Sequence, residues 1–177
     1  MQTWIVLLRG INVSGKNLIK MSALTQALSD SGLNNIRTYI QSGNIIFESE
    51  ETNPDVISGM VSNIIKARFE YDVPAIAILQ KELLQISKSN PFFSISDFDP
   101  AFMYITFLHR QPENEKIEAI EKLSFLPDIF SIQKNAVYVY CPNGYGKTKI
   151  NNSFFERKLG VMATTRNIAS VEKLCYL

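Results

Sequence analysis

The sequence has only two cysteines, a single histidine and no long hydrophobic run. Cys141 and Cys175 are too few and too far apart for a disulfide framework or a Cys-x-x-Cys metal knuckle. His109 would have to take part in any Ser-His-Asp or Cys-His arrangement, but it follows an apolar stretch beside Arg110, where a surface or capping role is the commoner one. The sequence also has no H-E-x-x-H or EF-hand pattern, so we expect no metal site and no cofactor.

No apolar stretch approaches the roughly 18 to 20 residues that a membrane-spanning helix needs. The N-terminal apolar run ends at Arg9, before the hydrophobic region of a signal peptide would be complete. Two free cysteines are most simply explained by a reducing compartment. The sequence therefore predicts a cytoplasmic protein without a membrane segment.

Enough apolar residues are present to build a core, because 46% of the 177 residues are hydrophobic and 20% are charged. A chain of this length forms one domain or two small subdomains. The net charge is only +1, but residues 1–47 carry +3, residues 48–133 carry −7 and residues 134–177 carry +5. Basic ends can indicate an anionic partner, or the uneven distribution can be ordinary scatter over two solvated faces.

The first half of the chain alternates between strand and helix patterns. The elements expected from apolar spacing are a strand over 3–9, a helix that Ser22 caps and Gly32 ends, strands over 36–40 and 44–47, a helix that starts at Asn53-Pro54, and a strand over 73–79. This order of strand, helix, two strands, helix and strand is typical of a ferredoxin-like unit. RNA-recognition modules have the same order, but the strand over 42–47 lacks their basic and aromatic consensus.

The second half predicts another mixed unit, with no internal repeat in the sequence. We expect a helix over 80–88, a strand over 102–108, a helix from Pro112, a hairpin of 129–133 with 137–141, and helices over 152–159 and from Asn167 to Leu174. The predicted fold class is α+β: a ferredoxin-like (βαββαβ) subdomain over 1–80, packed on a second, smaller α+β subdomain over 81–177. Prolines and polar residues indicate a linker around 90–100, and its three phenylalanines indicate that it packs down.

Two segments partly match phosphate-binding loops. Residues 10–17 have the G-x-x-x-x-G-K spacing, but Asn17 stands where a magnesium-binding Ser or Thr belongs, and the helix is delayed to about Ser22. Residues 141–148 end in Gly-Lys-Thr but begin with cysteine. These departures argue against a nucleotide triphosphatase, while lysines in glycine-flanked loops remain plausible contacts for an anion.

Several separated strings resemble the bacterial domain of unknown function 1697 family: Leu-Arg-Gly-Ile-Asn-Val at 8–13 with Gly-Lys-Asn at 15–17, Arg-Thr-Tyr-Ile-Gln-Ser-Gly-Asn at 37–44, Phe-Glu-Arg-Lys-Leu-Gly at 155–160 and Thr-Thr-Arg-Asn at 164–167. The resemblance spans nearly the whole chain. Relatives commonly have Gly at Ser14, Arg-Ser at Lys147-Thr148 and Trp at Ile168. The resemblance implies a two-part α+β fold in a cytoplasmic bacterial protein and implies no activity.

Polar residues of these strings and of the lysine loop form the candidate anion-binding set. Its members are Arg9, Asn12, Lys16, Gln41, Ser42, Asn44, Lys147, Lys149, Thr165, Arg166 and Asn167. We expect the first three to follow the first strand, and Thr165 to Asn167 to open the last helix. The hypothesis is that these segments meet across the subdomain cleft and bind a phosphorylated small molecule or a nucleic-acid backbone.

Three alternatives stay open. The glycines can merely satisfy turns while Arg9 and Arg166 bridge the subdomains. The chain can be a non-catalytic scaffold for a protein partner, which an exposed apolar patch would indicate. It can also be a transferase acting on a phosphorylated metabolite, with Lys16 or Lys147 oriented toward the leaving group.

Overall fold

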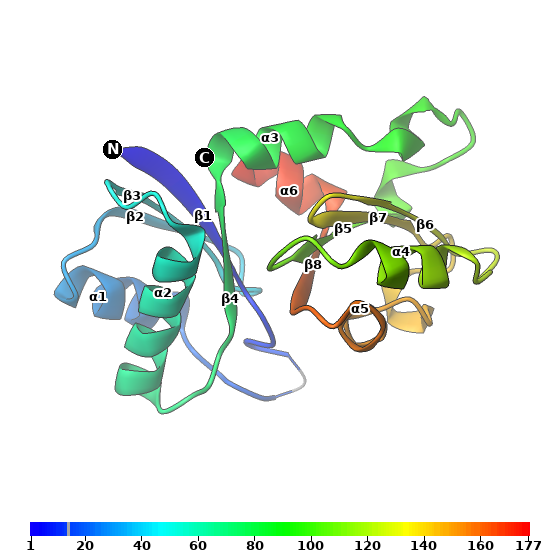
Figure 1. Cartoon of the computed structure of the whole chain (residues 1–177). Helices are drawn as coiled ribbons and strands as arrows, with labels where there is room; N and C mark the ends of the chain where they lie inside the picture. The colour runs from blue at the N-terminus through cyan, green and yellow to red at the C-terminus, as the bar shows by residue number, and fades with distance from the viewer. Residues whose placement is uncertain (14) are drawn as a thin grey trace. The chain divides into compact units, whose positions relative to one another are not determined.

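The computed structural model describes residues 1–13 and 15–177 (Figure 1). Ser14, one of the positions where the sequence departs from the family pattern, lies outside the described residues. This described part is a mixed α+β chain with two four-stranded antiparallel sheets and six α-helices. Internal packing divides the chain into unit 1, Met1–Leu83 with Leu177, and unit 2, Leu84–Tyr176.

Unit 1 contains the elements expected in the first half of the chain. They are β1 (Gln2–Leu8), α1 (Met21–Asp30), β2 (Asn34–Tyr39), β3 (Asn44–Ser49), α2 (Pro54–Phe69) and β4 (Ala75–Leu79). The sheet order is β2-β3-β1-β4, with every neighbouring pair antiparallel. Asn53 caps α2 as predicted, since its side chain accepts from the Asp55 N–H. The predicted Ser22 cap of α1 is wrong, because the N-cap position is Lys20 and the helix already begins at Met21.

The core of unit 1 lies between the sheet and its two helices. Trp4 and Val6 of β1 face Val61 of α2 and Leu24 of α1 in one buried cluster. Trp4 is the only tryptophan, and its indole N–H donates to the Glu51 carbonyl at 3.1 Å. Burial of this apolar stripe, rather than helix propensity, holds α1 and α2 on the sheet.

Unit 2 begins within α3 (Gln80–Lys88) and is the longer of the two units, against the expectation of a smaller second subdomain. Its other elements are η1 (Pro91–Ser94), η2 (Pro100–Phe102), β5 (Met103–Leu108), α4 (Asn114–Glu121), β6 (Ile129–Gln133), β7 (Ala136–Tyr140), η3 (Tyr145–Lys147), α5 (Asn152–Leu159), β8 (Ala163–Asn167) and α6 (Ile168–Leu174). The sheet order is β6-β7-β5-β8. Both sheets therefore have the same strand order and the same alternation with helices, although the sequence has no visible repeat.

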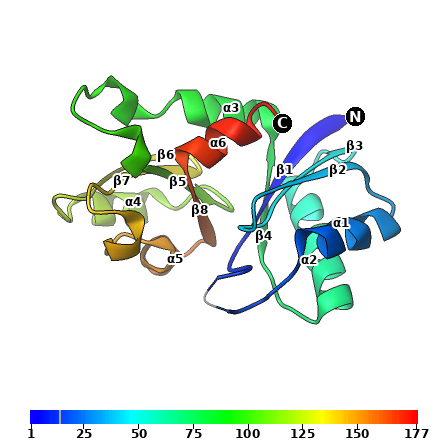
Figure 2. The same cartoon turned by 180° about the vertical axis from the view of Figure 1, so that it is seen from behind.

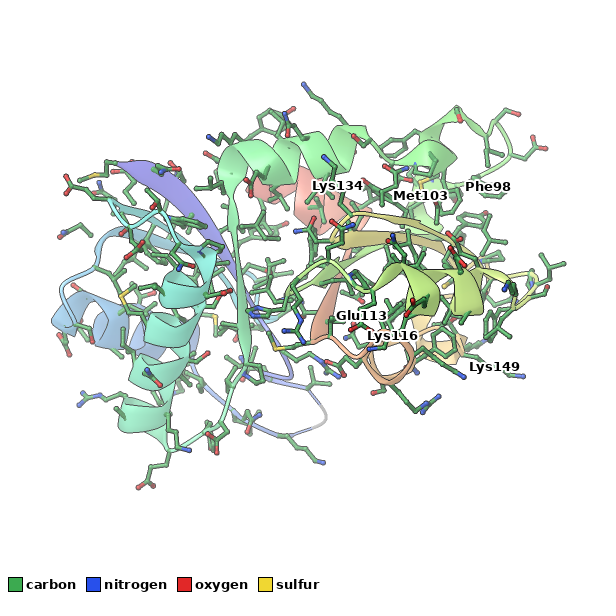
Figure 3. All side chains as sticks on the ribbon, in the orientation of Figure 1. Phe98, Met103, Glu113, Lys116, Lys134 and Lys149 are labelled. Carbon is green, nitrogen blue, oxygen red and sulfur yellow. The ribbon has the colours of Figure 1, made fainter. Side chains whose placement is uncertain are left out.

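One strand, β8, and the three short 3₁₀ helices η1, η2 and η3 were not expected. β8 pairs with β5 along its whole length, but its sequence Ala-Thr-Thr-Arg-Asn lacks the apolar alternation that indicates a strand. The segment around 90–100 packs down only in part: Phe92 is buried and the ring of Phe98, labelled in Figure 3, stacks on Tyr140 of β7 with the ring centroids 3.9 Å apart, whereas Phe93 is exposed. It lies within unit 2.

Helices cover both faces of the unit 2 sheet. On one face, Phe154 and Phe155 of α5 pack with Val137 and Val139 of β7 in a buried cluster. On the other face, α6 contacts β5 and β8, and Figure 2 shows it alongside α3. Over the described residues, none of the helices has both the length and the apolar character needed to cross a bilayer.

Candidate functional site

Asn12 fixes the loop that follows β1. Its carboxamide oxygen accepts from the Ile19 N–H at 2.8 Å, and its Nδ2 donates to the Ile19 carbonyl at 3.0 Å and to the Gln41 carbonyl at 2.9 Å. The first two bonds close the loop on itself, and the third joins it to the β2–β3 turn. One side chain therefore brings together two segments that lie 29 residues apart in the sequence.

Gly43 lets β1 and its loop approach the turn closely. The Leu8 N–H donates to the Gly43 carbonyl at 2.9 Å, and Gly43 has φ +74°. An added Cβ would lie 2.5 Å from Cγ2 of Ile11 and 2.9 Å from Cβ of Leu8. Glycine is therefore required here both by the backbone conformation and by the space.

The turn between β2 and β3 is closed by Asn44, which is buried. Its Nδ2 donates to the Tyr39 carbonyl at 2.9 Å and to the Ser42 hydroxyl at 3.1 Å. Within this turn Ile40 has φ +52°, a conformation that β-branched residues rarely adopt. Four of the predicted residues, Asn12, Gln41, Ser42 and Asn44, thus lie together, and the two asparagines hold backbone groups.

The loop that Asn12 joins to the β2–β3 turn carries three cationic side chains, Arg9, Lys16 and Lys20. Lys16 and Lys20 are exposed, whereas Arg9 is half-buried and its backbone N–H donates to the Pro74 carbonyl at 2.8 Å. Residues 9–20 and 40–44 contain no aspartate or glutamate. We call the loop over 9–20 with the turn over 40–44 the Asn12 surface.

The Asn12 surface also exposes aliphatic side chains that the sequence reasoning did not single out. Val13, Leu18 and Ile40 are 57%, 63% and 47% exposed. Each one is adjacent in the sequence to a residue that takes part in the Asn12 hydrogen bonds. Aliphatic residues in a loop that also contains Lys16 and Lys20 are a sequence signal from which this exposed apolar surface could have been predicted.

The loop over 10–17 differs from a nucleotide triphosphatase loop, as its sequence indicated. α1 begins only at Met21, and the Lys16 N–H donates to the Val13 carbonyl at 3.0 Å within the loop. Left-handed φ angles occur at Gly10, Asn12, Gly15 and Asn17. The Asn12 N–H also donates to the Asn17 carbonyl at 3.2 Å, so the described loop N–H groups of Asn12 and Lys16 are both used within the loop.

In unit 2 the predicted residues Thr165 and Arg166 lie on β8, so the expectation that they open the last helix is wrong. The reason is that pairing with β5 keeps the chain extended up to Asn167, whose side chain then caps α6 by accepting from the Ser170 N–H at 2.8 Å. Arg166 is buried, and its Nη1 donates to the Thr164 hydroxyl and to the Thr165 carbonyl, both at 2.9 Å.

Thr165 is the centre of a polar cluster between the sheet and α5. Its Oγ1 lies 2.7 Å from the Thr106 hydroxyl, accepts from the Tyr145 hydroxyl at 2.9 Å and donates to the Asn152 side-chain oxygen at 2.5 Å. Burial raises the pKa of Tyr145, so this hydroxyl remains a donor. The sequence reasoning missed the other three members, because no local pattern joins residues so far apart.

Lys147 and Lys149 lie in the loop between β7 and α5 and are exposed; Lys149 extends away from the ribbon in Figure 3. Thr148 between them is buried, donating to the Asp128 carboxylate at 2.6 Å and accepting from the Ile150 N–H at 3.1 Å. This anchor directs the two lysines outward. The structure therefore groups part of the predicted set around Asn12 in unit 1 and part around β8 and the lysine loop in unit 2.

No group of three or more His, Cys, Asp or Glu side chains among the described residues is arranged to hold a metal ion. His109 follows β5, and its backbone N–H donates to the Met162 carbonyl at 2.9 Å.

Comparison with known proteins assigns the chain to a family. Residues 1–138 match the family described as Protein of unknown function (DUF1697). The chain belongs to the DUF1697 family. The DUF1697 match includes the whole Asn12 surface and ends before Lys147, so the predicted residues of unit 2 lie beyond it.

A solved structure supports the fold of this DUF1697 chain. The structure of a conserved bacterial protein from Streptococcus pneumoniae has a TM-score of 0.75, covering 99% of this chain and 97% of that one at 22% sequence identity. At this identity the likeness shows a common fold. None of the curated proteins matches the chain.

Proposed function

We propose that the Asn12 surface binds a phosphate-bearing ligand, either a small molecule or a nucleic-acid backbone. The observation that carries the proposal is a cationic loop free of carboxylates, held by the three Asn12 hydrogen bonds. Lys16 and Lys20 supply exposed positive charge to this loop. A pre-organised loop loses little entropy when it binds an anion.

Thermal shift with a panel of ligands tests this proposal. Inorganic phosphate, nucleotides, sugar phosphates and an oligonucleotide are each added at low and at high salt. Stabilisation by small phosphates supports a metabolite site, whereas oligonucleotide binding that weakens steeply with salt supports nucleic acid. No response to any of them overturns the proposal.

The first prediction concerns Lys16 and Lys20. Replacing both by glutamine should abolish the thermal shift, because the loop then keeps its shape but loses its exposed charges. Lys81→Gln removes one exposed lysine of α3, outside the Asn12 surface, and should leave the shift unchanged. An unchanged shift in the Lys16→Gln/Lys20→Gln variant would show that the ligand binds elsewhere.

Lys147 and Lys149 are proposed as further anion contacts in unit 2. Their support is exposure and the Thr148 anchor that orients the loop. The double variant Lys147→Gln/Lys149→Gln, compared with Lys158→Gln on α5, measures their contribution in the same assay. Loss of the shift in this double variant, with the Lys158→Gln variant unchanged, supports these contacts, and an unchanged shift in the double variant overturns them.

A protein-interaction scaffold is the second candidate function. The exposed aliphatic residues Val13, Leu18 and Ile40 favour it, because aliphatic groups beside lysines fit an apolar partner surface with an acidic rim. Partner binding should be lost in Val13→Ser/Leu18→Ser, and phosphate binding should not. The double variants Val13→Ser/Leu18→Ser and Lys16→Gln/Lys20→Gln therefore separate the two functions.

The strand order of unit 1 supports one finer proposal about the fold. Two outer strands flanking two inner ones in the order β2-β3-β1-β4, all antiparallel, with α1 and α2 as the connections, is the arrangement expected of a ferredoxin-like unit. Unit 2 has the corresponding order. We propose that both units are ferredoxin-like.

A further inference from the structure

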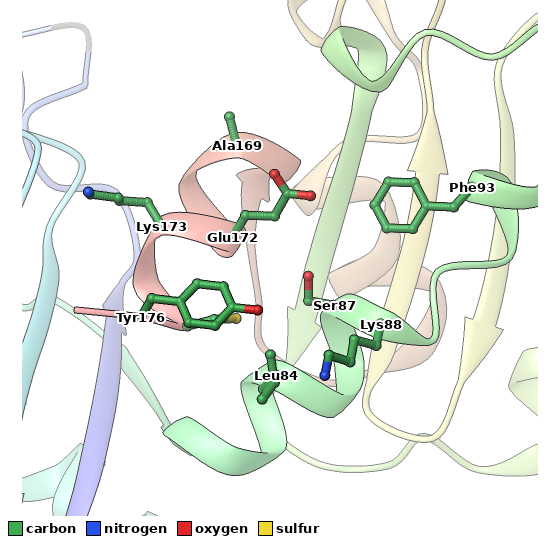
Figure 4. A pocket seen from close by; sticks show the side chains of 9 residues that line it. Leu84, Ser87, Lys88, Phe93, Ala169, Glu172, Lys173 and Tyr176 are labelled. Carbon is green, nitrogen blue, oxygen red and sulfur yellow. The ribbon is translucent and has the colours of Figure 1, made fainter.

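A groove in unit 2 lies between α3 and α6, on the face of the sheet opposite α5. Its volume is about 680 Å³, within the usual range for small-molecule pockets. The lining side chains, shown in Figure 4, belong to Leu84, Ser87, Lys88, Phe93, Ala169, Glu172, Lys173, Cys175 and Tyr176. All of them belong to unit 2 and none belongs to the candidate anion-binding set.

The floor of the groove is small, polar and buried. Ser87 and Cys175 are each only 6% exposed, and the Ser87 hydroxyl lies close enough to the Cys175 thiol to act on its pKa, which it lowers. Burial raises the pKa of this thiol, and the Glu172 carboxylate adds to that effect while Lys88 opposes it. Glu172 and Lys88 are thus both close enough to Cys175 to act on its thiol, so one negative and one positive side chain lie beside the floor of the groove.

The two walls carry these opposite charges without pairing them. Lys88 comes from α3 and Glu172 from α6. Among the described residues, neither side chain takes part in an ion pair or a hydrogen bond. The groove therefore offers one free ammonium group and one free carboxylate on opposite helices, a pattern that complements a ligand with both charges.

Two aromatic rings border the same space. Phe93 from η1 is 43% exposed and Tyr176 is 76% exposed, which are high values for aromatic residues. Figure 4 shows the Phe93 ring on the far side of the groove from Tyr176, with the Glu172 carboxylate between them. Exposed ring faces and edges are suited to receive a flat apolar group.

We propose that this groove binds a small zwitterion that carries an aromatic ring, such as a free aromatic amino acid. The ligand's ammonium group is held by Glu172, its carboxylate by Lys88, and its ring by Phe93 and Tyr176. A ligand with only one charge would leave the other wall charge without a partner. A zwitterion without a ring would leave the aromatic surface uncovered.

Isothermal titration of the full chain with four probes tests this assignment. L-phenylalanine carries all three features, whereas phenylacetate lacks the ammonium group, phenethylamine lacks the carboxylate and L-alanine lacks the ring. We expect L-phenylalanine to bind and each of the others to bind at least about tenfold more weakly. Absence of saturable binding of L-phenylalanine up to about 10 mM, or equal affinity for all four, overturns the proposal.

Variants of the walls assign each contact. Glu172→Gln should lower the affinity for L-phenylalanine about tenfold and leave the affinity for phenylacetate unchanged. Lys88→Met should also lower the affinity for L-phenylalanine about tenfold, but it should leave the affinity for phenethylamine unchanged. Lys173→Met is the matched control, because Lys173 lies at the rim and points away from the other lining side chains in Figure 4. Circular dichroism verifies that each variant is folded. Binding that survives both wall substitutions unchanged overturns the proposal.

Discussion

A single methyl group at Gly43 should destabilise unit 1 by more than its size suggests. In Gly43→Ala the new Cβ meets Ile11 and Leu8 at contact distances that require them to move, and alanine is strained at φ +74°. We expect a loss of about 2 to 4 kcal/mol in the free energy of unfolding, from overpacking and backbone strain together. Urea denaturation followed by Trp4 fluorescence measures it.

Gly10 supplies the control for this prediction. It has nearly the same backbone conformation, φ +73°, but no atom lies within 4 Å of an added Cβ. Gly10→Ala should therefore cost only the backbone strain, about 1 kcal/mol. Equal losses in the two variants would mean that close packing at Gly43 contributes nothing.

The raised pKa of the buried Tyr138 hydroxyl predicts that the protein loses stability at alkaline pH. Burial raises the pKa of its hydroxyl from the ordinary 10 to about 12, while the hydroxyl donates to the Ile86 carbonyl at 2.9 Å. Because the folded state holds this proton more tightly than the unfolded state, its contribution is present below pH 10 and is lost as the pH rises from 10 to 12. Denaturation measured across this range should show the decline.

Tyr138→Phe separates the two effects of the hydroxyl. Near neutral pH the variant should be less stable by about 1 kcal/mol, since one buried hydrogen bond is lost. Above pH 10 the difference from the wild type should shrink, because phenylalanine has no proton to lose. A difference that stays constant up to pH 12 would contradict the assigned pKa.

At the scale of elements, β8 is held to the rest of unit 2 by the Thr165 cluster as well as by pairing with β5. Thr165→Val keeps the shape of the side chain but removes the oxygen shared by Thr106, Tyr145 and Asn152. We expect a loss of about 2 to 3 kcal/mol, because the buried Thr106 hydroxyl and the half-buried Tyr145 and Asn152 side chains are left with fewer partners. Thermal or urea unfolding measures it.

Thr165→Ser is the matched variant for β8. It keeps the hydroxyl and removes only a methyl group, so most of the stability should remain, at a cost of about 1 kcal/mol. Similar losses in Thr165→Ser and Thr165→Val would place the contribution in the methyl group instead of the hydrogen bonds.

The elements that could be predicted are those with local signals. α3 and α5 match their predicted bounds because apolar spacing marks both helices and Gly160 ends α5. β8 could not be predicted, since its strand state depends on β5, about 60 residues away, and not on its own polar sequence. For the same reason the sequence could nominate Asn12 but not reveal that it holds Ile19 and Gln41.

The candidate residues show the same limit for function. A sequence string identifies residue types, but burial decides which of them can meet a ligand. Arg166, nominated as an anion contact, is buried with its Nη1 on Thr164 and Thr165, whereas Lys16 and Lys20 are exposed. The groove of unit 2 was missed entirely, because Lys88 and Glu172 come from helices that only the fold brings together.

At the scale of the whole molecule, the chain contains a separate probe for each unit. Trp4 is buried in the core of unit 1, while Cys141 and Cys175 are buried in unit 2. Burial raises the pKa of both thiols, that of Cys141 to about 11, so they react slowly in the folded protein. Tryptophan fluorescence therefore follows unit 1, and labelling by a disulfide reagent such as dithiodipyridine follows unit 2.

Core truncations should move these two probes differently. The buried cluster around Val61 contains only unit 1 residues, and the one around Phe155 contains only unit 2 residues. Val61→Ala should lower the urea midpoint reported by Trp4 more than the midpoint reported by thiol exposure, and Phe155→Leu should do the reverse. In each variant the free energy of unfolding of the altered unit should fall by about 1 to 3 kcal/mol. Equal shifts of both probes in both variants would show that the two cores unfold as one cooperative unit.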